Sequence, residues 1–204
     1  MTDHYFSADP SVTFAREPLT CEVWGQRLDL VSGSGVYSRG RLDIGTSVLF
    51  RETEPPAPGR VLDLGTGYGV IGLAIAAAWR ADGVPVPDGH VTGVEVNQRA
   101  VLLANENAAS LGLAARFAAV TPDAVPAEET YDEIWSNPPI RIGKQALHDL
   151  LRHWFARLRP DGRAVMVVGK NLGGDSLQSW LTDQGHPTTR LASAKGFRVL
   201  ESRC

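Results

Sequence analysis

The sequence contains little cysteine, no long hydrophobic run and no excess of positive charge. Its two cysteines, Cys21 and Cys204, lie at opposite ends of the chain, which excludes a zinc motif of short spacing and a disulfide framework. The longest apolar stretch, residues 70–79, is far shorter than the roughly 20 residues that cross a bilayer. The first residues include Asp3 and Asp9 and have no apolar core, which excludes a signal peptide. We therefore expect a soluble, cytoplasmic protein without a membrane partner.

The charge balance limits the possible partners. The 204 residues carry a formal net charge of −3 and the sequence pI is near 5.9, so no global basic field is available to hold nucleic acid. Any contact with RNA therefore requires a local basic patch. His148 and His153 are five positions apart, and a helix brings metal ligands to one face at a spacing of four. We assign no metal.

The length favours a single domain, 1–204, because domains typically contain roughly 100 to 200 residues. The Pro-rich stretch PPAPG, 55–59, separates an N-terminal part, 1–54, from a core, 60–204, in which strand-like and helix-like patterns alternate. That alternation is typical of an α/β fold with a mostly parallel sheet covered by helices on both faces.

The hydrophobic periodicity and the turn residues place the individual elements. In the core we expect strands at 60–64, 90–96, 115–120, 131–136, 163–169, 188–192 and 197–202, and helices at 69–80, 98–111, 143–158 and 175–184. In the N-terminal part we expect an irregular arm at 4–18, a hairpin of 20–24 and 26–31, and a short helix at 47–51 with Thr46 as its N-cap. Asn97 is predicted to cap the helix at 98–111, and Gly112 is predicted to end it. The segment RPDG, 159–162, is predicted to stop the helix at 143–158.

A glycine-rich turn, RVLDLGTGYG at 60–69, follows the first core strand and opens a helix, which is how α/β folds place a ligand at the end of a strand. Gly67, Gly69 and Gly72 satisfy the dinucleotide fingerprint, and Glu95 follows at the end of the next strand as a ribose ligand. Asp63 shifts the interpretation towards S-adenosylmethionine, whose ammonium and sulfonium favour a nearby carboxylate. The turn alone does not decide between a dinucleotide and S-adenosylmethionine.

A second motif, SNPPI at 136–140, follows the fourth core strand and so emerges at the same edge of the sheet. The two prolines fix the backbone and leave carbonyls without local N–H partners. The Asn137 side-chain oxygen and the Pro138 carbonyl can then hold the two N–H bonds of a planar amino group. Methyl transfer from a sulfonium depends mainly on such positioning, because the leaving group is already activated. Asn137 is therefore the predicted catalytic residue.

Together, VLDLGTGYGVIGLA, VEVN and SNPPI resemble class I S-adenosylmethionine-dependent methyltransferases that act on exocyclic or amide nitrogens. HYFSADPSV at 4–12, SGVYSRGRLDIGT at 34–46, NPPIRIGK at 137–144 and the ending KGFRVLESR resemble the ribosomal RNA small-subunit methyltransferase C-like family, in its short, single-domain form. The resemblance implies a Rossmann-like three-layer sandwich, with a seven-stranded sheet whose last strand is antiparallel and an N-terminal hairpin packed on it. It also implies methylation of a guanine amine in ribosomal RNA.

The resemblance assigns the site residues. Catalytic or base-contacting residues are Asn137, Pro138, Pro139 and Ile140. Residues at the S-adenosylmethionine site are Asp43, Gly45, Thr46, Asp63, Gly65, Thr66, Gly67, Gly69, Glu95, Val96, Asn97, Thr121 and Asn137. Basic residues near these motifs are expected to ring the mouth of the pocket and contact RNA if the fold is right, and we assign this role to Arg39, Arg141 and Lys144.

This chain departs from the family where well-known members place an aromatic residue after NPP to stack on the base, since it has Ile140 there. The alternative activities are a protein-glutamine or small-molecule N-methyltransferase, a non-catalytic S-adenosylmethionine-binding or RNA-binding protein, and a dehydrogenase. The sequence leaves open whether the protein is a monomer or a homodimer.

Overall fold

The computed structural model describes residues 13–204. The motif at 4–12 and most of the predicted arm lie outside the described residues. Within them, no helix has the length and apolar character needed to cross a membrane.

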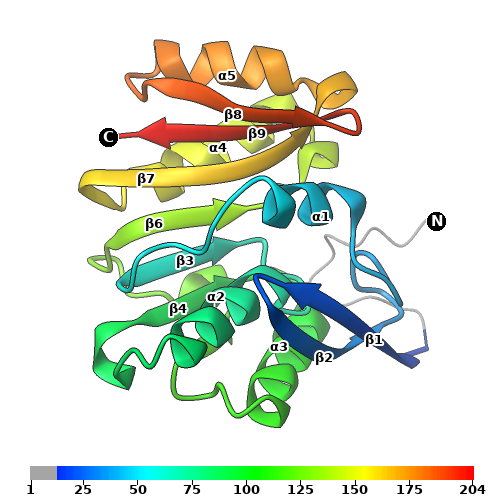
Figure 1. Ribbon diagram of the computed structural model, residues 1–204. Helices are drawn as coiled ribbons and strands as arrows, with labels where there is room; N and C mark the ends of the chain where they lie inside the picture. Colours follow the sequence, from blue (N-terminus) through cyan, green and yellow to red (C-terminus); the bar gives the residue numbers. More distant parts are fainter. Residues whose placement is uncertain (1–12) are drawn as a thin grey trace.

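A seven-stranded sheet forms the centre of the molecule, in the order β5-β4-β3-β6-β7-β9-β8 (Figure 1). Its strands are β3 (Arg60–Leu64), β4 (His90–Val94), β5 (Phe117–Val120), β6 (Tyr131–Ser136), β7 (Leu158–Gly169), β8 (Thr188–Ala194) and β9 (Phe197–Arg203). The pairs from β5 to β7 are parallel, whereas β9 runs antiparallel to both β7 and β8. The predicted α/β class, with an antiparallel last strand, is confirmed.

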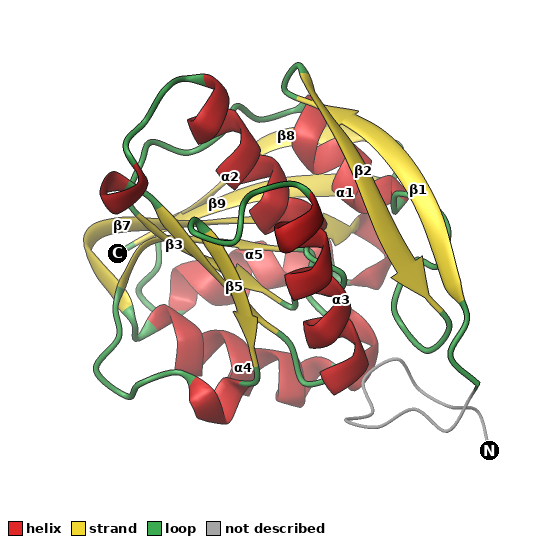
Figure 2. Ribbon diagram, turned by 90° about the horizontal axis from the view of Figure 1, so that it is seen from below, coloured by secondary structure: helices red, strands yellow, loops and turns green. Residues whose placement is uncertain are grey.

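Helices cover both faces of this sheet (Figure 2). One face carries α1 (Ile44–Arg51), α2 (Val70–Ala81) and α3 (Gln98–Ser110), and the other carries α4 (Lys144–Phe155) and α5 (Gly174–Asp183). Neighbouring strand residues alternate between the two hydrophobic cores: Val61 belongs to the first and Leu62 to the second. The strands are apolar on both sides, as expected of a parallel sheet that is buried on both faces.

The N-terminal hairpin of β1 (Arg16–Val23) and β2 (Gln26–Gly33) packs against α2 and α3. Asn107 of α3 is buried at this junction. Its amide accepts from the Val31 N–H at 2.8 Å and donates to the carbonyls of Val31 and Tyr68, each at 2.9 Å. One asparagine thus ties the hairpin to the turn before α2.

Several predicted boundaries differ from the structure, and three of these differences have a clear physical reason. The first strand begins at Arg16, so it includes residues that were assigned to the arm. Helix α1 begins at Ile44 with Asp43 as its N-cap, because the Asp43 carboxylate accepts a hydrogen bond from the Thr46 N–H at 3.1 Å. Strand β7 begins at Leu158 and includes the RPDG segment, since Leu158 already pairs with Tyr131 and a register shift follows. A bulge of this kind admits turn residues inside a strand.

Among residues 13–204, four short 3-10 helices lie in the connections: η1 (Val86–Asp88), η2 (Pro122–Ala124), η3 (Ile140–Ile142) and η4 (Lys170–Leu172). Two of them follow the carboxyl ends of β6 and β7, beside the site described next.

Candidate active site

A cavity of about 320 Å³ lies at the carboxyl ends of the central strands. The strand order reverses between β3 and β6, and such switch points are where open α/β sheets bind ligands. The glycine-rich turn after β3 and the NPP segment after β6 both line this cavity. The topology therefore joins the two motifs that the sequence separates by about 70 residues.

The turn after β3 has a left-handed backbone at Gly65, Gly67 and Gly69, with φ of 74°, 56° and 94°. An added Cβ at Gly67 would meet no atom within 4 Å, so this glycine borders open space in the cavity. Gly69 does not line the cavity; it is the N-cap of α2. The turn thus exposes backbone to a ligand at a place where side chains would intrude.

Asp63 lies beneath this turn rather than in the cavity. Its Oδ2 accepts hydrogen bonds from Thr66 Oγ1 at 2.5 Å and from the Gly72 N–H at 2.8 Å, while Oδ1 has no partner among the described residues. Burial raises the pKa of Asp63 to about 6. The carboxylate is fully buried and does not line the cavity. Asp63 faces α2 and holds the turn against the helix.

Glu95 follows β4 and lines the cavity. Its Oε2 accepts from the Gly67 N–H and its Oε1 from the Asn97 N–H, both at 3.1 Å. Burial raises the pKa of this carboxyl. Val96 and Asn97 also line the cavity, and Asn97 caps α3 as predicted. A carboxylate fixed by two backbone groups at this place is suited to accept hydrogen bonds from ribose hydroxyls.

The Asn137 side chain is oriented by α1. Its Nδ2 donates to Asp43 Oδ2 at 2.8 Å and to Thr46 Oγ1 at 3.0 Å. Because an amide nitrogen has two N–H donors, both are used, and the side-chain oxygen is the atom left to accept from a ligand. All three residues line the cavity.

Tyr37, which is not among the predicted site residues, extends this network. Its hydroxyl donates to Asp43 Oδ1 at 2.8 Å, and burial followed by this hydrogen bond raises the pKa of the phenol. The residue is 45% exposed and lines the cavity. Its position in the motif at 34–46 is the feature of the sequence that could have identified it as a site residue.

The NPP backbone differs from the expectation in one respect. The Pro138 carbonyl does have a local partner, because the Ile140 N–H donates to it at 2.8 Å. Pro139, with φ of −75° and ψ of 69°, closes an inverse γ-turn that makes this bond. A carbonyl oxygen has two lone pairs, so a second hydrogen bond from a ligand can still form. Pro138, Pro139 and Ile140 all line the cavity.

Several predicted residues lie outside the cavity lining. Gly45 packs against Phe197, since an added Cβ would lie 2.9 Å from the Phe197 ring. Thr121 is the N-cap of η2, beside the lining residue Pro122. Arg39 forms an ion pair with Glu17 of the hairpin.

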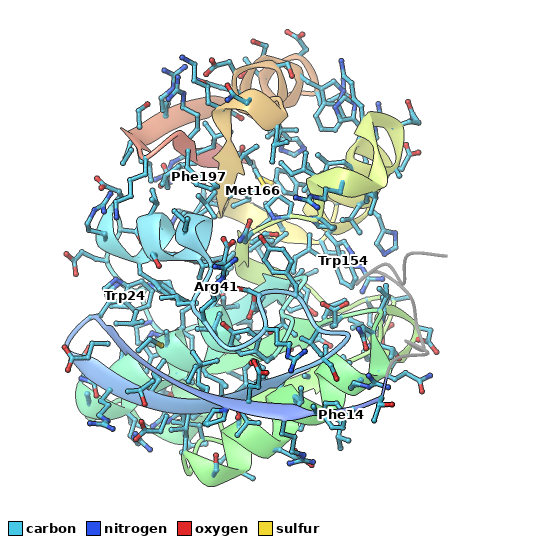
Figure 3. All side chains as sticks on the ribbon, turned by 90° about the vertical axis from the view of Figure 1, so that its right-hand side faces the viewer. Phe14, Trp24, Arg41, Trp154, Met166 and Phe197 are labelled. Atoms are coloured by element: carbon cyan, nitrogen blue, oxygen red, sulfur yellow. The ribbon has the colours of Figure 1, made fainter. Side chains whose placement is uncertain are left out.

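The cations at the cavity mouth differ in part from those predicted. Arg141 lines the cavity, while Lys144 lines a neighbouring one. Arg41 is not one of the three residues assigned to the RNA, yet both Arg41 and Arg141 lie close enough to Tyr37 that their charges oppose the rise in its pKa. Figure 3 looks onto this edge and shows Arg41 near its middle, between Phe197 and the hairpin. Neither arginine forms an ion pair within residues 13–204.

The cavity fits S-adenosylmethionine in volume and in chemistry. Its volume is within the range of about 300 to 1,000 Å³ that small-molecule sites occupy. Glu95 can hold a ribose, Gly65 and Gly67 present open backbone, and Val96 and Pro122 present apolar surface to an adenine. When bound, this group supplies an activated methyl on a sulfonium. In the described part of the chain, no cluster of His, Cys, Asp and Glu is suited to hold a metal ion.

Comparison with known proteins agrees with this geometry. The family model described as methyltransferase small domain matches residues 27–201. The chain is 29% identical to the protein YbxB of Bacillus subtilis (strain 168), over 100% of this chain and 99% of that protein. It is 34% identical to the ribosomal RNA small subunit methyltransferase C of Pseudomonas entomophila (strain L48), over 97% of this chain and 57% of that protein.

Among solved structures, the chain resembles the 16S rRNA N2 G1207 methyltransferase (RsmC) of T. thermophilus in complex with AdoMet and guanosine. The TM-score is 0.75 at 23% identity, covering 95% of this chain and 52% of that one. The chain thus spans little more than half the length of these methyltransferases. The fold, the glycine-rich turn and the family match agree: the chain belongs to the methyltransferase small domain family of S-adenosylmethionine-dependent methyltransferases.

Proposed function

We propose that the protein methylates the exocyclic amine of a guanine in small-subunit ribosomal RNA, in the cytoplasm. The observation that carries this proposal is the orientation of Asn137. Both N–H donors of its amide are held by Asp43 and Thr46, so its oxygen is left to accept a hydrogen bond from an acceptor amine.

The proposed chemistry is positioning of a planar nitrogen. The Asn137 oxygen and the second lone pair of the Pro138 carbonyl accept the two N–H bonds of the amine. The nitrogen lone pair, which lies perpendicular to those bonds, then faces the side of the cavity formed by Gly65 and Gly67. Because the donor already carries its leaving group, holding the reacting atoms in line supplies most of the acceleration.

Features at the cavity mouth support a nucleobase in RNA as the acceptor. Ile140 offers only apolar contact, but Tyr37 and Phe197 line the same cavity from other segments and provide aromatic surface. Aromatic contact with a base contributes about 1 to 3 kcal/mol in single-strand binders. Arg41 and Arg141 supply a local basic patch on a chain whose net charge is −3. Such a patch is what an RNA substrate requires of an acidic protein.

The relatives support guanine in particular. Several are named as methyltransferases of small-subunit ribosomal RNA, and one neighbour was solved with guanosine. These proteins are longer than this chain, so the choice of nucleotide belongs to the proposal.

The test is mass spectrometry of nucleosides from small-subunit ribosomal RNA, in cells with and without the gene and after complementation. We expect one methylguanosine to disappear in the deletion and to return with the wild type but not with Asn137→Ala. Asn105→Ala is the matched control: its amide bonds only to the backbone of Ala119, away from the cavity, so it tests for simple loss of stability. An unchanged guanine profile, or label from S-adenosylmethionine only in protein, would refute the proposal.

A further inference from the structure

A second cavity, of about 170 Å³, adjoins the active site. Ile140 and Leu172 line both cavities, so the two adjoin at these residues. The remaining lining of the second cavity comes from α4, the end of β7 and the start of α5: Lys144, Leu147, His148, Val168, Gly173, Ser176 and Leu177.

Positive charge and backbone donors gather at this cavity. Lys144 lines it and forms no ion pair within residues 13–204. Helix α4 begins at Lys144 and α5 at Gly174, and neither N-cap glycine, Gly143 or Gly173, supplies a side chain to accept from the first N–H groups. Two helix N-termini with free N–H groups favour an anion through hydrogen bonds and through the helix dipole.

His148 is an independent sign of a ligand here. It is 7% exposed, and its ring lines the cavity and stacks on Trp180 with centroids 3.6 Å apart. Neither ring nitrogen forms a hydrogen bond with a described residue. Burial, together with the neighbouring cations Lys144 and Arg152, lowers the pKa of this histidine. The neutral ring has one N–H, which no described residue accepts and which is available to a ligand in the cavity.

The nearby carboxylates are engaged elsewhere. Asp149 accepts from Gln145 and pairs with Arg152. Asp175 pairs with Arg190 and Arg198. Neither aspartate lines the cavity. The Ser176 hydroxyl donates to the Gly173 carbonyl at 2.9 Å, so its hydrogen is already engaged.

We propose that this second cavity binds a phosphate of the RNA strand, next to the nucleoside whose base enters the active site. The inference rests on the proposed function and deepens it. A base held at Asn137 and a phosphate held by Lys144, His148 and the two helix N-termini lie on either side of Ile140.

The first test compares guanosine with guanosine 5′-monophosphate and guanosine 3′-monophosphate, by calorimetry on the protein saturated with S-adenosylhomocysteine. We expect one monophosphate to bind at least tenfold more tightly than guanosine. Lys144→Ala combined with His148→Phe should abolish that preference and leave guanosine affinity unchanged, since Phe keeps the stacking on Trp180. Lys170→Ala, a lysine that lines neither cavity, is the matched control and should keep the preference.

Equal binding of guanosine and both monophosphates would overturn the phosphate site while leaving the guanine site intact. Inorganic phosphate that binds as tightly as the preferred monophosphate would also overturn it, because the site would then serve a free anion. If guanosine does not bind at all, the proposed function fails, and the salt dependence of binding to ribosomal RNA decides the phosphate site separately. Lys144→Ala should then reduce the logarithmic salt slope by about one phosphate contact relative to Lys170→Ala, and an unchanged slope would refute the site.

Discussion

Asp43→Ala tests the network that orients the catalytic asparagine. The carboxylate accepts three hydrogen bonds, from Tyr37, from the Thr46 N–H and from Asn137. Its removal frees the Asn137 amide to rotate and also removes the N-cap of α1. The variant should therefore lose catalytic rate, because the bond to Asn137 is lost, and stability, because the bond to the Thr46 N–H is lost.

The two losses can be estimated separately. A hydrogen bond to a charged group contributes about 1.5 to 3 kcal/mol, which corresponds to a fall in the methyl-transfer rate of about 10- to 150-fold. Loss of a helix N-cap costs about 1 to 2 kcal/mol of the free energy of unfolding. Asp43→Asn keeps an oxygen for Thr46 and Asn137 and places its nitrogen at the Tyr37 oxygen. Because it loses the charge and keeps the geometry, its rate should fall by less than about tenfold.

The assay measures kcat for transfer of labelled methyl from S-adenosylmethionine to small-subunit ribosomal RNA, together with urea unfolding. Thr53→Ala is the matched control, because it removes a hydrogen bond of 2.7 Å to the Leu49 carbonyl at the other end of α1. We expect it to lower stability without lowering kcat. A folded Asp43→Ala protein with wild-type kcat would refute the positioning role. An equal fall in kcat for Thr53→Ala would show that the stability of α1, and not the orientation of Asn137, controls the rate.

Three further predictions follow from packing, burial and charge. Gly72→Ala should lower the Tm, since the added Cβ would lie 2.5 Å from the Phe117 ring and overpacking costs about 1 to 3 kcal/mol; an unchanged Tm would contradict the close fit of α2 on the sheet. Burial raises the pKa of Asp63 from its ordinary value of 3.8 to about 6, so its ionisation destabilises the folded state by about 3 kcal/mol. This effect is absent below about pH 4 and complete above about pH 6. The stability of Asp63→Asn relative to wild type should therefore rise from pH 4 to 6 in urea unfolding, and a constant difference would argue against the shift. Arg141→Ala should raise the KM for ribosomal RNA more than Arg39→Ala does, because Arg39 is paired with Glu17; equal effects in steady-state kinetics would place both at the RNA.

Much of the architecture was predictable from local patterns. The strands at 60–64 and 131–136 have the predicted bounds, since each is a short apolar run with a turn signal at its end. The Asn97 cap was predictable because capping depends on a side chain and the backbone two or three residues away. Where pairing with a distant strand decided the outcome, local signals failed: RPDG is a turn by composition, yet it lies within β7 because Leu158 pairs with Tyr131.

The site divides in the same way. The sequence by itself determined the glycine-rich turn, the carboxylate after the second core strand and the NPP segment, because their chemistry is written in contiguous residues. Only the tertiary structure decided that Asp43 and Asn137, 94 residues apart, share a hydrogen bond. It also decided that Asp63 faces α2 and that Arg39 is paired with the hairpin. Such contacts depend on which faces the packed layers bring together. A local pattern of residues does not encode which residues distant in the sequence become neighbours.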